Sequence, residues 1–257
     1  MKARPSKDLI YAQFARIAKA LGNAKRLEVL DLLAQAPRHV EALATETGMS
    51  VASVSQHLQV LRHAGLVECE RQGTKMEYQL ADESVLRLWL DLRSVAESRL
   101  AELTVAFGLM KGDRAREEAI SPETARTLLR GGEACLVDVR PLIEYQNGHA
   151  PGAQPIPIDE LPYRTDDLPR DRLIIAYSRG KYCLLADKAV AILRLRGFRA
   201  LRLNDGWAEW KVERRGGFGI AAMQLAGANR IIRSERKGVR ARVTRPSDSY
   251  SSRNTHR

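Results

Sequence analysis

The stretch "VEALATETGMSVASVSQHLQVLRHAGLV", residues 40–67, decides the fold of the first half of the chain. Its spacing predicts a short helix over 40–47, a turn at Gly48, and a second helix for which Ser50 supplies the N-terminal cap. Two helices joined by a short turn are typical of a helix-turn-helix unit. The stretch therefore favours a mostly helical first half, in which the second helix of this unit contacts DNA.

The second predicted helix has an apolar side and a polar side. Hydrophobic residues recur at intervals of three and four, which predicts a buried stripe formed by Val51, Val54, Leu58 and Leu61. Polar side chains on the other faces are of the kind that hydrogen-bond base edges in a major groove. The predicted DNA contacts of this helix are Ser53, Ser55, Gln56, His57 and Arg62. Every amphipathic helix has a polar face, so this pattern alone is weak support.

The residues that follow this helix predict a β-hairpin. In "LVECERQGTKMEYQL", residues 66–80, two strand-like segments flank a turn over 72–75. Arg71 and Lys75 lie beside the tip, where their charges can meet DNA phosphates. Such contacts position a protein on DNA without specifying the sequence. A hairpin directly after a helix-turn-helix is a wing, and it strengthens the interpretation of the reading helix.

Two long amphipathic segments flank this unit. The first carries an apolar face formed by Leu9, Phe14, Ile17 and Leu21. The second is predicted as one helix, whose apolar face is formed by Val85, Trp89, Leu92, Ala96, Leu100, Leu103 and Phe107. Because these faces are long for so small a unit, we expect them to pair between two copies of the chain.

Together with "KALGNAKRLEVLDLLAQ" (19–35), these motifs resemble the arsenic-repressor-type (ArsR) winged-helix regulators over roughly residues 8–107. The resemblance implies a homodimeric repressor that leaves double-stranded operator DNA when a metal, a metalloid or a reactive sulfur species is sensed. Metal-sensing members often carry a Cys-Val-Cys pair where this chain has "HVEALATETG" (39–48). We therefore predict no metal site and no cofactor, and we expect Cys69 in the wing to be a packing residue.

The second half alternates strands and helices. Ser121 is predicted to cap a helix that Pro122 begins and Gly131 ends. Strands are predicted over 135–139, 172–177 and 199–203. Near-continuous apolar runs such as the second of these suit a parallel sheet covered on both faces. The predicted fold is multidomain, with a mostly α winged helix-turn-helix domain followed by an α/β domain that has a central parallel sheet.

This second half resembles a single rhodanese domain over 121–212. The resemblance rests on the segments "LVDVRPLIEYQNGHAPGAQPIPIDEL" (136–161), "AYSRGKYCLLADKAVAILRLRGF" (176–198) and "LRLNDGWAEW" (201–210). In this family the loop position held here by Ser178 is a Cys whose thiolate takes a sulfane sulfur as a persulfide. The resemblance implies that loop N–H groups, a helix starting at Cys183 and the nearby Arg179 would stabilise that anion.

Ser178 changes the chemistry expected of this loop. The motif has no neighbouring His to deprotonate a serine, and oxygen cannot store a transferable sulfane sulfur. We therefore expect the loop to hold an anion without turnover, which leaves open whether the chain is an enzyme. Two origins of Ser178 stay open, an engineered Cys-to-Ser change and a naturally silent sensor domain. Cys183 is not expected to act as a substitute, because its side chain is expected to turn into the domain.

Further residues take supporting roles by the same resemblance. Asp138 and Arg140 would brace the loop, Glu144 would fix the following helix, and the segment 149–152 would turn the chain. Asn147 replaces the Asp or Glu of many members, which should matter little. The predicted anion-binding positions of the loop are Gly180, Lys181, Tyr182 and Cys183.

The net charge of +11 is concentrated at one end of the 257-residue chain. Residues 217–257 hold nine Lys/Arg and two Asp/Glu, so they carry +7 of this charge without an apolar period. A solvated disordered tail, a basic arm for DNA phosphates and an extension read in a non-native frame are all compatible with this composition. The predicted organisation is a winged-helix domain (1–108), a linker (109–120), a rhodanese-like domain (121–216) and this tail.

The remaining features concern location and function. The N-terminus lacks the apolar core of a signal peptide, and no run approaches the roughly 20 apolar residues that span a bilayer. We expect a cytoplasmic protein without a membrane partner. The predicted function is DNA-binding transcriptional regulation, with a fused rhodanese-like domain that senses or processes reactive sulfur from a small anion or a persulfide donor. The alternative is a sulfurtransferase that uses the winged helix mainly for dimerisation.

Overall fold

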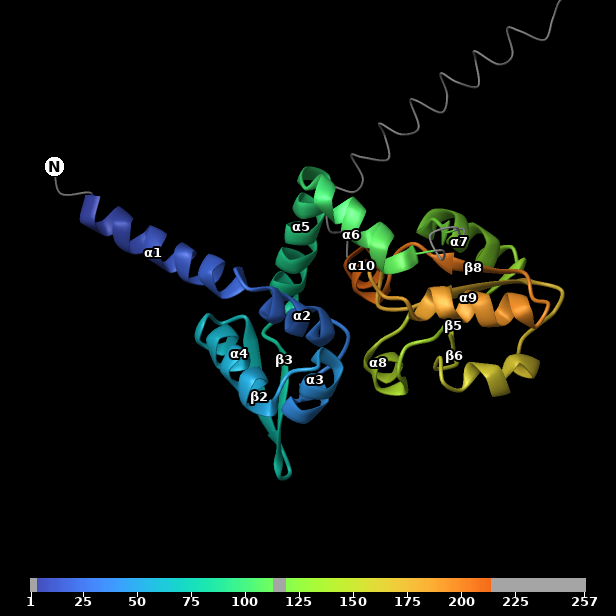
Figure 1. Ribbon diagram of the computed structural model, residues 1–257, viewed down its shortest axis with the longest axis horizontal. Helices are drawn as coiled ribbons and strands as arrows, with labels where there is room; N and C mark the ends of the chain where they lie inside the picture. Colours follow the sequence, from blue (N-terminus) through green and yellow to red (C-terminus); the bar gives the residue numbers. More distant parts are fainter. Residues whose placement is uncertain (1–3, 113–118, 214–257) are drawn as a thin grey trace, which may run out of the picture. The chain divides into compact units, whose positions relative to one another are not determined.

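The computed structural model describes residues 4–112 and 119–213 (Figure 1). The first range contains α1 (Arg4–Leu21), α2 (Ala24–Leu33), β1 (Arg38–His39), α3 (Val40–Thr47), α4 (Val51–His63), β2 (Val67–Gln72), β3 (Lys75–Leu80), α5 (Glu83–Arg99) and α6 (Ala101–Lys111). The second contains β4 (Ala119–Ile120), α7 (Pro122–Arg130), β5 (Ala134–Asp138), α8 (Leu142–Asn147), β6 (Gln154–Pro155), two 3₁₀ turns (Leu161–Tyr163 and Thr165–Asp167), β7 (Leu173–Tyr177), α9 (Leu185–Leu195), β8 (Ala200–Leu203) and α10 (Trp207–Glu213). Both ranges belong to one compact unit. Neither range contains a helix with the length and apolar character of a membrane span.

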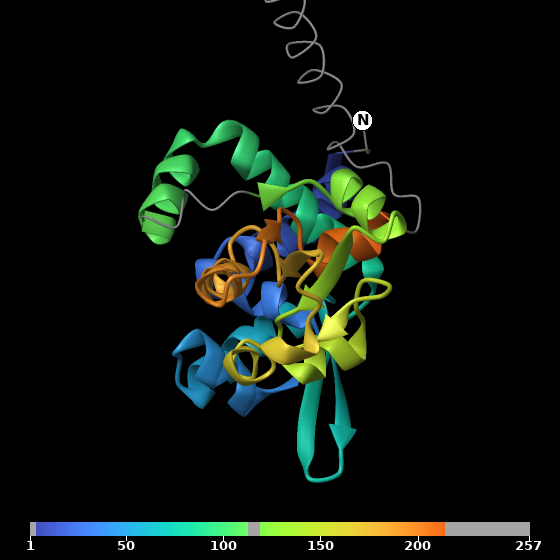
Figure 2. The same ribbon diagram turned by 90° about the vertical axis from the view of Figure 1, so that its right-hand side faces the viewer.

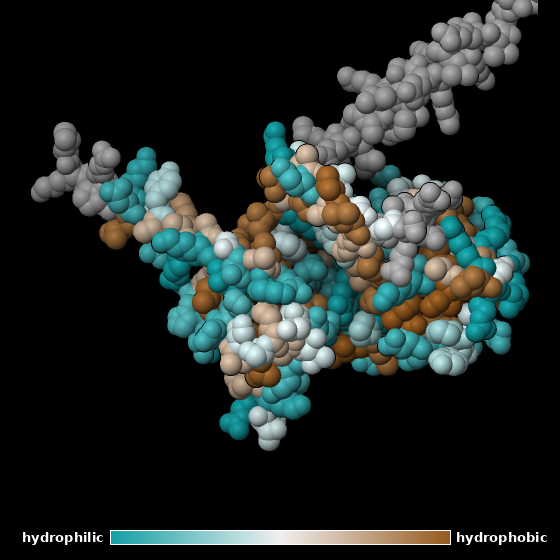
Figure 3. All heavy atoms as spheres, in the orientation of Figure 1, coloured by the Kyte–Doolittle hydropathy of each residue, from teal (hydrophilic) through white to brown (hydrophobic). Residues whose placement is uncertain are grey.

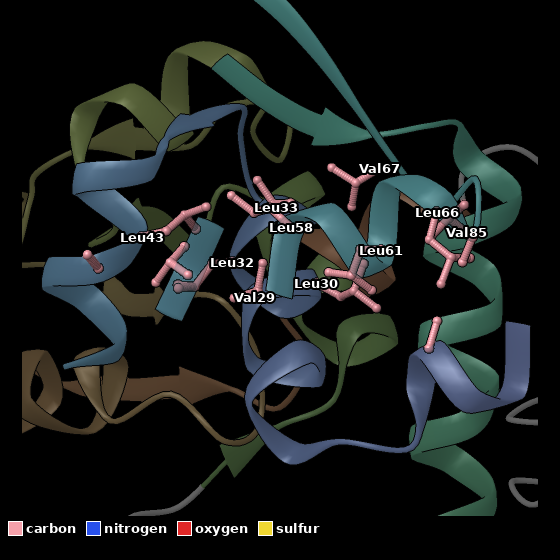
Figure 4. Close-up of a cluster of buried hydrophobic side chains, with 14 residues drawn as sticks. Val29, Leu30, Leu32, Leu33, Leu43, Leu58, Leu61, Leu66, Val67 and Val85 are labelled. Atoms are coloured by element: carbon pink, nitrogen blue, oxygen red, sulfur yellow. The ribbon is translucent and has the colours of Figure 1, made fainter. Parts of the chain in front are cut away.

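One apolar cluster forms the main core of the first range (Figure 4). The predicted stripe of α4 supplies Val54, Leu58 and Leu61, which are fully buried against α2 and α3. Capping fixes where α4 begins, because the Ser50 side chain accepts a hydrogen bond from the Ser53 N–H at 3.2 Å. The helix-turn-helix prediction is thus confirmed, with both helices at their expected places.

The prediction that Val51 belongs to the buried stripe is wrong. Val51 is 47% exposed, whereas Val54, one turn later, has no exposed surface. Val51 is the first residue of α4 and follows the cap directly. The helix therefore begins before the apolar cluster does, so its first turn lies at the edge of the core.

A small antiparallel sheet follows the helices, in the order β1-β3-β2. The pair β2–β3 forms the predicted hairpin, with Arg71 opposite Met76 and Gln72 opposite Lys75. Gly73 provides the positive φ (61°) that the tight turn requires. Figure 2 shows this hairpin extending away from the helices of its own half. Sequence reasoning missed β1, whose two residues give no strand period.

The last apolar segment of the first half is two helices rather than the one predicted. Leu100 adopts an extended conformation (φ −109°, ψ 101°) between α5 and α6. A helix-forming composition does not reveal this break, because neither Gly nor Pro marks it. The break separates an α5 that packs on the first half from an α6 with highly exposed apolar residues, among them Val105 and Leu109.

The second range is built on a five-stranded sheet in the order β4-β8-β7-β5-β6, and all of its strand pairs are parallel. The three predicted strands appear as β5, β7 and β8, each within one residue of its expected bounds. Two apolar clusters line the sheet, and the residues of β7 alternate between them: Ile174 and Ala176 belong to one, Ile175 and Tyr177 to the other. Burial on both faces explains the continuous apolar run of this strand.

One further sequence prediction concerns where a helix begins. The helix after the loop begins at Leu185 and not at Cys183, because residues 180–183 form a turn in which the Cys183 N–H donates to the Gly180 carbonyl at 3.0 Å. The predicted tail over 217–257 and residues 113–118 of the predicted linker lie outside the described residues.

Candidate functional site

The predicted reading face of α4 is on the surface. Gln56 and Arg62 are exposed, and Ser53, Ser55 and His57 are partly exposed. The Ser55 hydroxyl bonds back to the Val51 carbonyl at 2.8 Å, so it is already engaged within its own helix. Gln56, His57 and Arg62 carry groups that suit base-edge contacts.

The wing tip brings the two predicted basic residues to the surface. Arg71 and Lys75 are both exposed. The Arg71 Nε donates to the Gly73 carbonyl at 3.0 Å, which holds this side chain over the turn. Lys75 begins β3 on the other side of the turn. Two cations at the end of a projecting hairpin are suited to phosphate contacts.

Ser178 follows β7 directly and is buried, with 2% of its surface exposed. A serine nucleophile needs a general base within hydrogen-bond reach. The histidine hydrogen bonds in the described ranges go to backbone carbonyls: His39 to Met76, His63 to Gln59 and His149 to Tyr145. This arrangement offers Ser178 no activating base of that kind.

Asp138 and Arg140 form the buried base of the loop. The two carboxylate oxygens of Asp138 accept hydrogen bonds from Arg140 Nε and NH2 at 2.9 and 2.5 Å. Neither side chain is exposed. The Tyr177 hydroxyl donates to the same carboxylate at 2.5 Å and accepts from the Ala150 N–H. Burial and the adjacent carboxylate raise the pKa of Tyr177, so its hydroxyl stays a donor. This cluster ties the end of β7 to β5.

Arg179 is already paired with carboxylates. Its Nε and NH2 donate to Glu144 Oε1 at 2.9 and 2.5 Å, and its NH2 lies 2.6 Å from Glu46 Oε2. Burial alone would lower the pKa of this guanidinium, but the hydrogen bonds and charge of Glu144, with the charge of Glu46, raise it. An anion held by the loop would therefore compete with these carboxylates for Arg179.

The other loop residues also have partners in the first half. Lys181 Nζ and the Tyr182 hydroxyl reach the two oxygens of Glu97 at 2.9 and 2.7 Å. The Tyr182 ring packs edge-on against Phe107 at 5.3 Å between centroids. These contacts bind the loop to α5 and α6.

Gly180 and Gly206 allow the loop to take its path. Gly180 has a φ of 135°, which side chains other than glycine rarely adopt. A methyl group on Gly206 would overlap the backbone of Arg179 and Gly180. The Gly206 N–H also donates to Glu209 Oε2 at 3.0 Å. Gly206 and Glu209 thus shape the loop from the next βα connection.

The Cys183 side chain is not turned into the domain as predicted. It is partly exposed and lines a cavity of about 1230 Å³, together with Arg179, Tyr182 and Glu46. The expectation that its side chain turns into the domain is wrong, because the turn at 180–183 delays the start of the helix. The cavity opens beside the loop.

Sequence reasoning missed the loop's partners in the first half. Gln35 is fully buried, its side-chain oxygen accepts from Arg140 NH1 at 3.2 Å, and its carbonyl accepts from Asn147 at 3.0 Å. Arg38, Glu46, Arg93 and Glu97 each make an ion pair with a residue of the second half. The one local signal available in the sequence was a polar residue, Gln35, between Ala34 and Ala36 directly after the apolar α2.

The two sites define a DNA-reading winged helix joined to a rhodanese-type loop, and the comparisons with known proteins agree. Bacterial regulatory proteins of the arsR family match residues 23–68, and the rhodanese-like domain matches residues 121–213. The HTH-type transcriptional regulator Rv0324 of Mycobacterium tuberculosis is 48% identical over 200 residues, which cover 78% of this chain and 88% of that protein. The chain therefore belongs to the arsR family of bacterial regulatory proteins, and its second half is a rhodanese-like domain.

Two further similarities cover about a third of the chain each. The HTH-type transcriptional regulator YgaV of Escherichia coli is 32% identical over 84 residues, which cover 32% of this chain and 85% of that protein. The solution structure of a homodimeric winged helix-turn-helix DNA-binding domain, Mb0332 of Mycobacterium bovis, is 47% identical and covers 37% of this chain and 89% of that one. Its TM-score is 0.36.

Proposed function

We propose that the chain is a cytoplasmic transcriptional repressor that binds double-stranded operator DNA as a homodimer. The observation that carries this proposal is the exposed surface of α4 and of the wing. Gln56 and His57 lie on α4 outside its buried residues Val54, Leu58 and Leu61, and Lys75 lies at the wing tip. Base-edge contacts from α4 would give sequence specificity, and the wing would add phosphate contacts. In this proposal the winged-helix domain spans 1–108 and the rhodanese-like domain spans 121–216.

The exposed apolar residues of the first half support a second copy as partner. On α1, Leu9, Tyr11 and Phe14 are 68%, 59% and 64% exposed. On α6, Val105 and Leu109 are 64% and 80% exposed, and Figure 3 shows hydrophobic residues gathered along this helix. Exposed patches of this kind are typical of interfaces. A symmetric dimer would also place two reading helices on one operator.

The DNA-binding proposal is tested by a mobility shift with the DNA upstream of the protein's own gene. Gln56→Ala should weaken specific binding by about 1–3 kcal/mol, because one base contact is lost. Binding to unrelated DNA should stay the same. Gln146→Ala, an exposed glutamine of α8, is the matched control and should have no effect. Equal operator affinity of Gln56→Ala, His57→Ala and the parent would refute the assignment of specificity to α4.

We further propose that the rhodanese-like domain senses reactive sulfur without turnover. The support is the loop geometry together with the oxygen nucleophile of Ser178. In Ser178→Cys, a thiolate would attack the outer sulfur of thiosulfate, so that a Cys persulfide forms, the S–S bond of thiosulfate breaks and sulfite leaves with the electron pair. Cyanide would then remove the sulfur as thiocyanate.

A thiosulfate-to-cyanide assay tests this part of the proposal and the rival sulfurtransferase. The Ser178 protein should give only background thiocyanate, and Ser178→Cys should give turnover. The double variant Ser178→Cys with Cys183→Ser should keep that turnover. Turnover by the Ser178 protein that Cys183→Ser abolishes would instead assign the chemistry to Cys183.

A further inference from the structure

Four charged side chains form a closed ring of ion pairs between the two halves of the chain. Arg38 of β1 and Glu46 of α3 come from the winged helix, and Glu144 of α8 and Arg179 come from the rhodanese-like domain. Arg38 NH1 lies 2.7 Å from Glu46, and Arg179 NH2 lies 2.6 Å from Glu46 and 2.5 Å from Glu144. Arg38 NH2 also pairs with Glu144. Each carboxylate thus contacts both guanidinium groups.

The members of this ring differ in their exposure to water. The side chains of Glu144 and Arg38 are 0% and 5% exposed, and those of Arg179 and Glu46 are 17% and 25% exposed. Leaving a buried charge without its partner is strongly unfavourable. Glu46 is the member with the most water contact, so its release from the ring costs least. The pair between Arg179 and Glu46 is therefore the one that can open.

Glu46 connects the ring to the reading helix. It lies in the last turn of α3, between Ala44, which belongs to the core that α4 shares, and Thr47, which is also buried. Gly48 follows with a φ of 65°, and Ser50 then caps α4. A shift at Glu46 would be transmitted through this short turn to the cap of α4.

Arg179 connects the ring to the rhodanese loop, because it follows Ser178 directly. Any anion bound at the loop adds a third negative group beside a guanidinium that two carboxylates already share. A ligand can shift such an equilibrium only through its different affinity for the two arrangements. Competition for Arg179 supplies that difference.

We infer that Glu46 and an anion in the Ser178 loop compete for Arg179, so that occupation of the loop releases α3 and weakens DNA binding. This inference rests on the proposed function, since it assigns the route between the sulfur site and the DNA site. Coupling free energies between sites typically correspond to factors of roughly 5–150 in affinity. An effect of about fivefold or more on DNA affinity is therefore expected.

The test uses a fixed anion in the full-length chain. Ser178→Asp places a carboxylate at the loop, and Ser178→Asn is the neutral control of nearly equal size. DNA affinity of both is measured by fluorescence anisotropy, in the parent and in the Glu46→Gln background. Ser178→Asp should weaken binding about fivefold or more relative to Ser178→Asn, and this difference should vanish with Glu46→Gln. An equal difference in both backgrounds would overturn the inference.

A second variant tests the same inference without a change at the buried position 178, where a carboxylate could prevent folding. Arg179→Met opens the pair from the other side and should also weaken DNA binding about fivefold or more. Combined with Glu46→Gln, it should weaken binding no further than either change alone. Arg164→Met, whose side chain pairs with Glu160 and Asp167 of its own half, should not alter affinity. Independent, multiplying effects of Arg179→Met and Glu46→Gln would overturn the inference.

Hydrogen exchange separates failure of this inference from failure of the proposed function. Arg179→Met should speed amide exchange over residues 44–55 without any DNA present, whereas Arg164→Met should not. If the parent binds no DNA, the proposed function is wrong. Amide exchange over residues 44–55 then still shows whether Arg179 is coupled to α4. Unchanged exchange in this segment would show that the ring does not connect the loop to α4.

Discussion

The reading helix and the Ser178 loop use polar residues in opposite ways. On α4, the polar residues lie on the surface, and the buried residues beneath them are apolar. Around the loop, the charged residues are themselves buried and already paired: Asp138, Arg140 and Glu144 have no exposed surface. The first arrangement separates binding from stability, so a surface residue can change without unfolding the protein. In the second arrangement the same residues shape the site and stabilise the fold, because each buried charge needs its partner.

The largest effect expected from this difference is on stability at the base of the loop. Asp138→Ala leaves Arg140 buried without its carboxylate, and breaking such a pair costs about 3–5 kcal/mol. Denaturant unfolding measures the loss in the free energy of unfolding. Glu160→Gln, which removes an exposed partner of Arg164, should change this free energy by less than about 1 kcal/mol. Similar losses in both variants would remove the contrast between buried and exposed charges.

A second prediction concerns the close approach behind the loop. Gly206→Ala should lower the free energy of unfolding by about 1–3 kcal/mol, because its methyl group would overlap the Arg179 and Gly180 backbone. Gly108→Ala in α6 is the matched control, since a methyl group there meets no atom within 4 Å. Alanine within a helix should instead stabilise this position by about 0.5–1 kcal/mol. Thermal unfolding gives the sign of both changes, and stabilisation by Gly206→Ala would contradict the loop geometry.

A third prediction sharpens the description of the winged helix. Lys75→Ala should lower the slope of log affinity against log salt by about 0.9, the contribution of one phosphate contact. The preference for one DNA sequence over another should stay as in the parent, unlike the result for Gln56→Ala. Affinity titrations at several salt concentrations provide the slope. A loss of sequence preference in Lys75→Ala would mean that the wing reads bases.

The smallest expected effect comes from a carboxyl group beneath α5. Asp31 accepts from the Trp89 Nε1 at 2.9 Å, and burial raises the pKa of Asp31 above its ordinary value. The folded protein thus binds this proton more tightly than the unfolded chain, so stability falls as pH rises through the interval between the two pKa values. Asp31→Asn should modestly raise the free energy of unfolding at pH 7. This gain should vanish below the ordinary aspartate pKa of about 3.9. Equal gains at pH 3 and pH 7 would contradict an origin in ionisation.

Local signals predicted most of the fold. Ser50 and Ser121 marked helix starts because their side chains accept hydrogen bonds from N–H groups three residues later, and both caps are present. The alternation of strands and helices predicted the parallel sheet because each strand must be buried on both faces. The break at Leu100 and the exposed Val51 were not predictable in this way. Both depend on where neighbouring elements end, and periodicity within one segment does not contain that information.

By itself, the sequence determined the class of each half and the oxygen that stands at position 178, because spacing, capping and residue type act over a few neighbouring positions. Only the tertiary structure decided what the loop contacts. Glu46 and Arg179 are 133 residues apart in the chain, yet their side chains lie 2.6 Å apart. A carboxylate on a helix is ordinarily a solvated surface group, and no local pattern distinguishes one that a distant guanidinium will partly bury. The pairing arises because packing of the two halves takes both charges partly out of water, so that each stabilises the other.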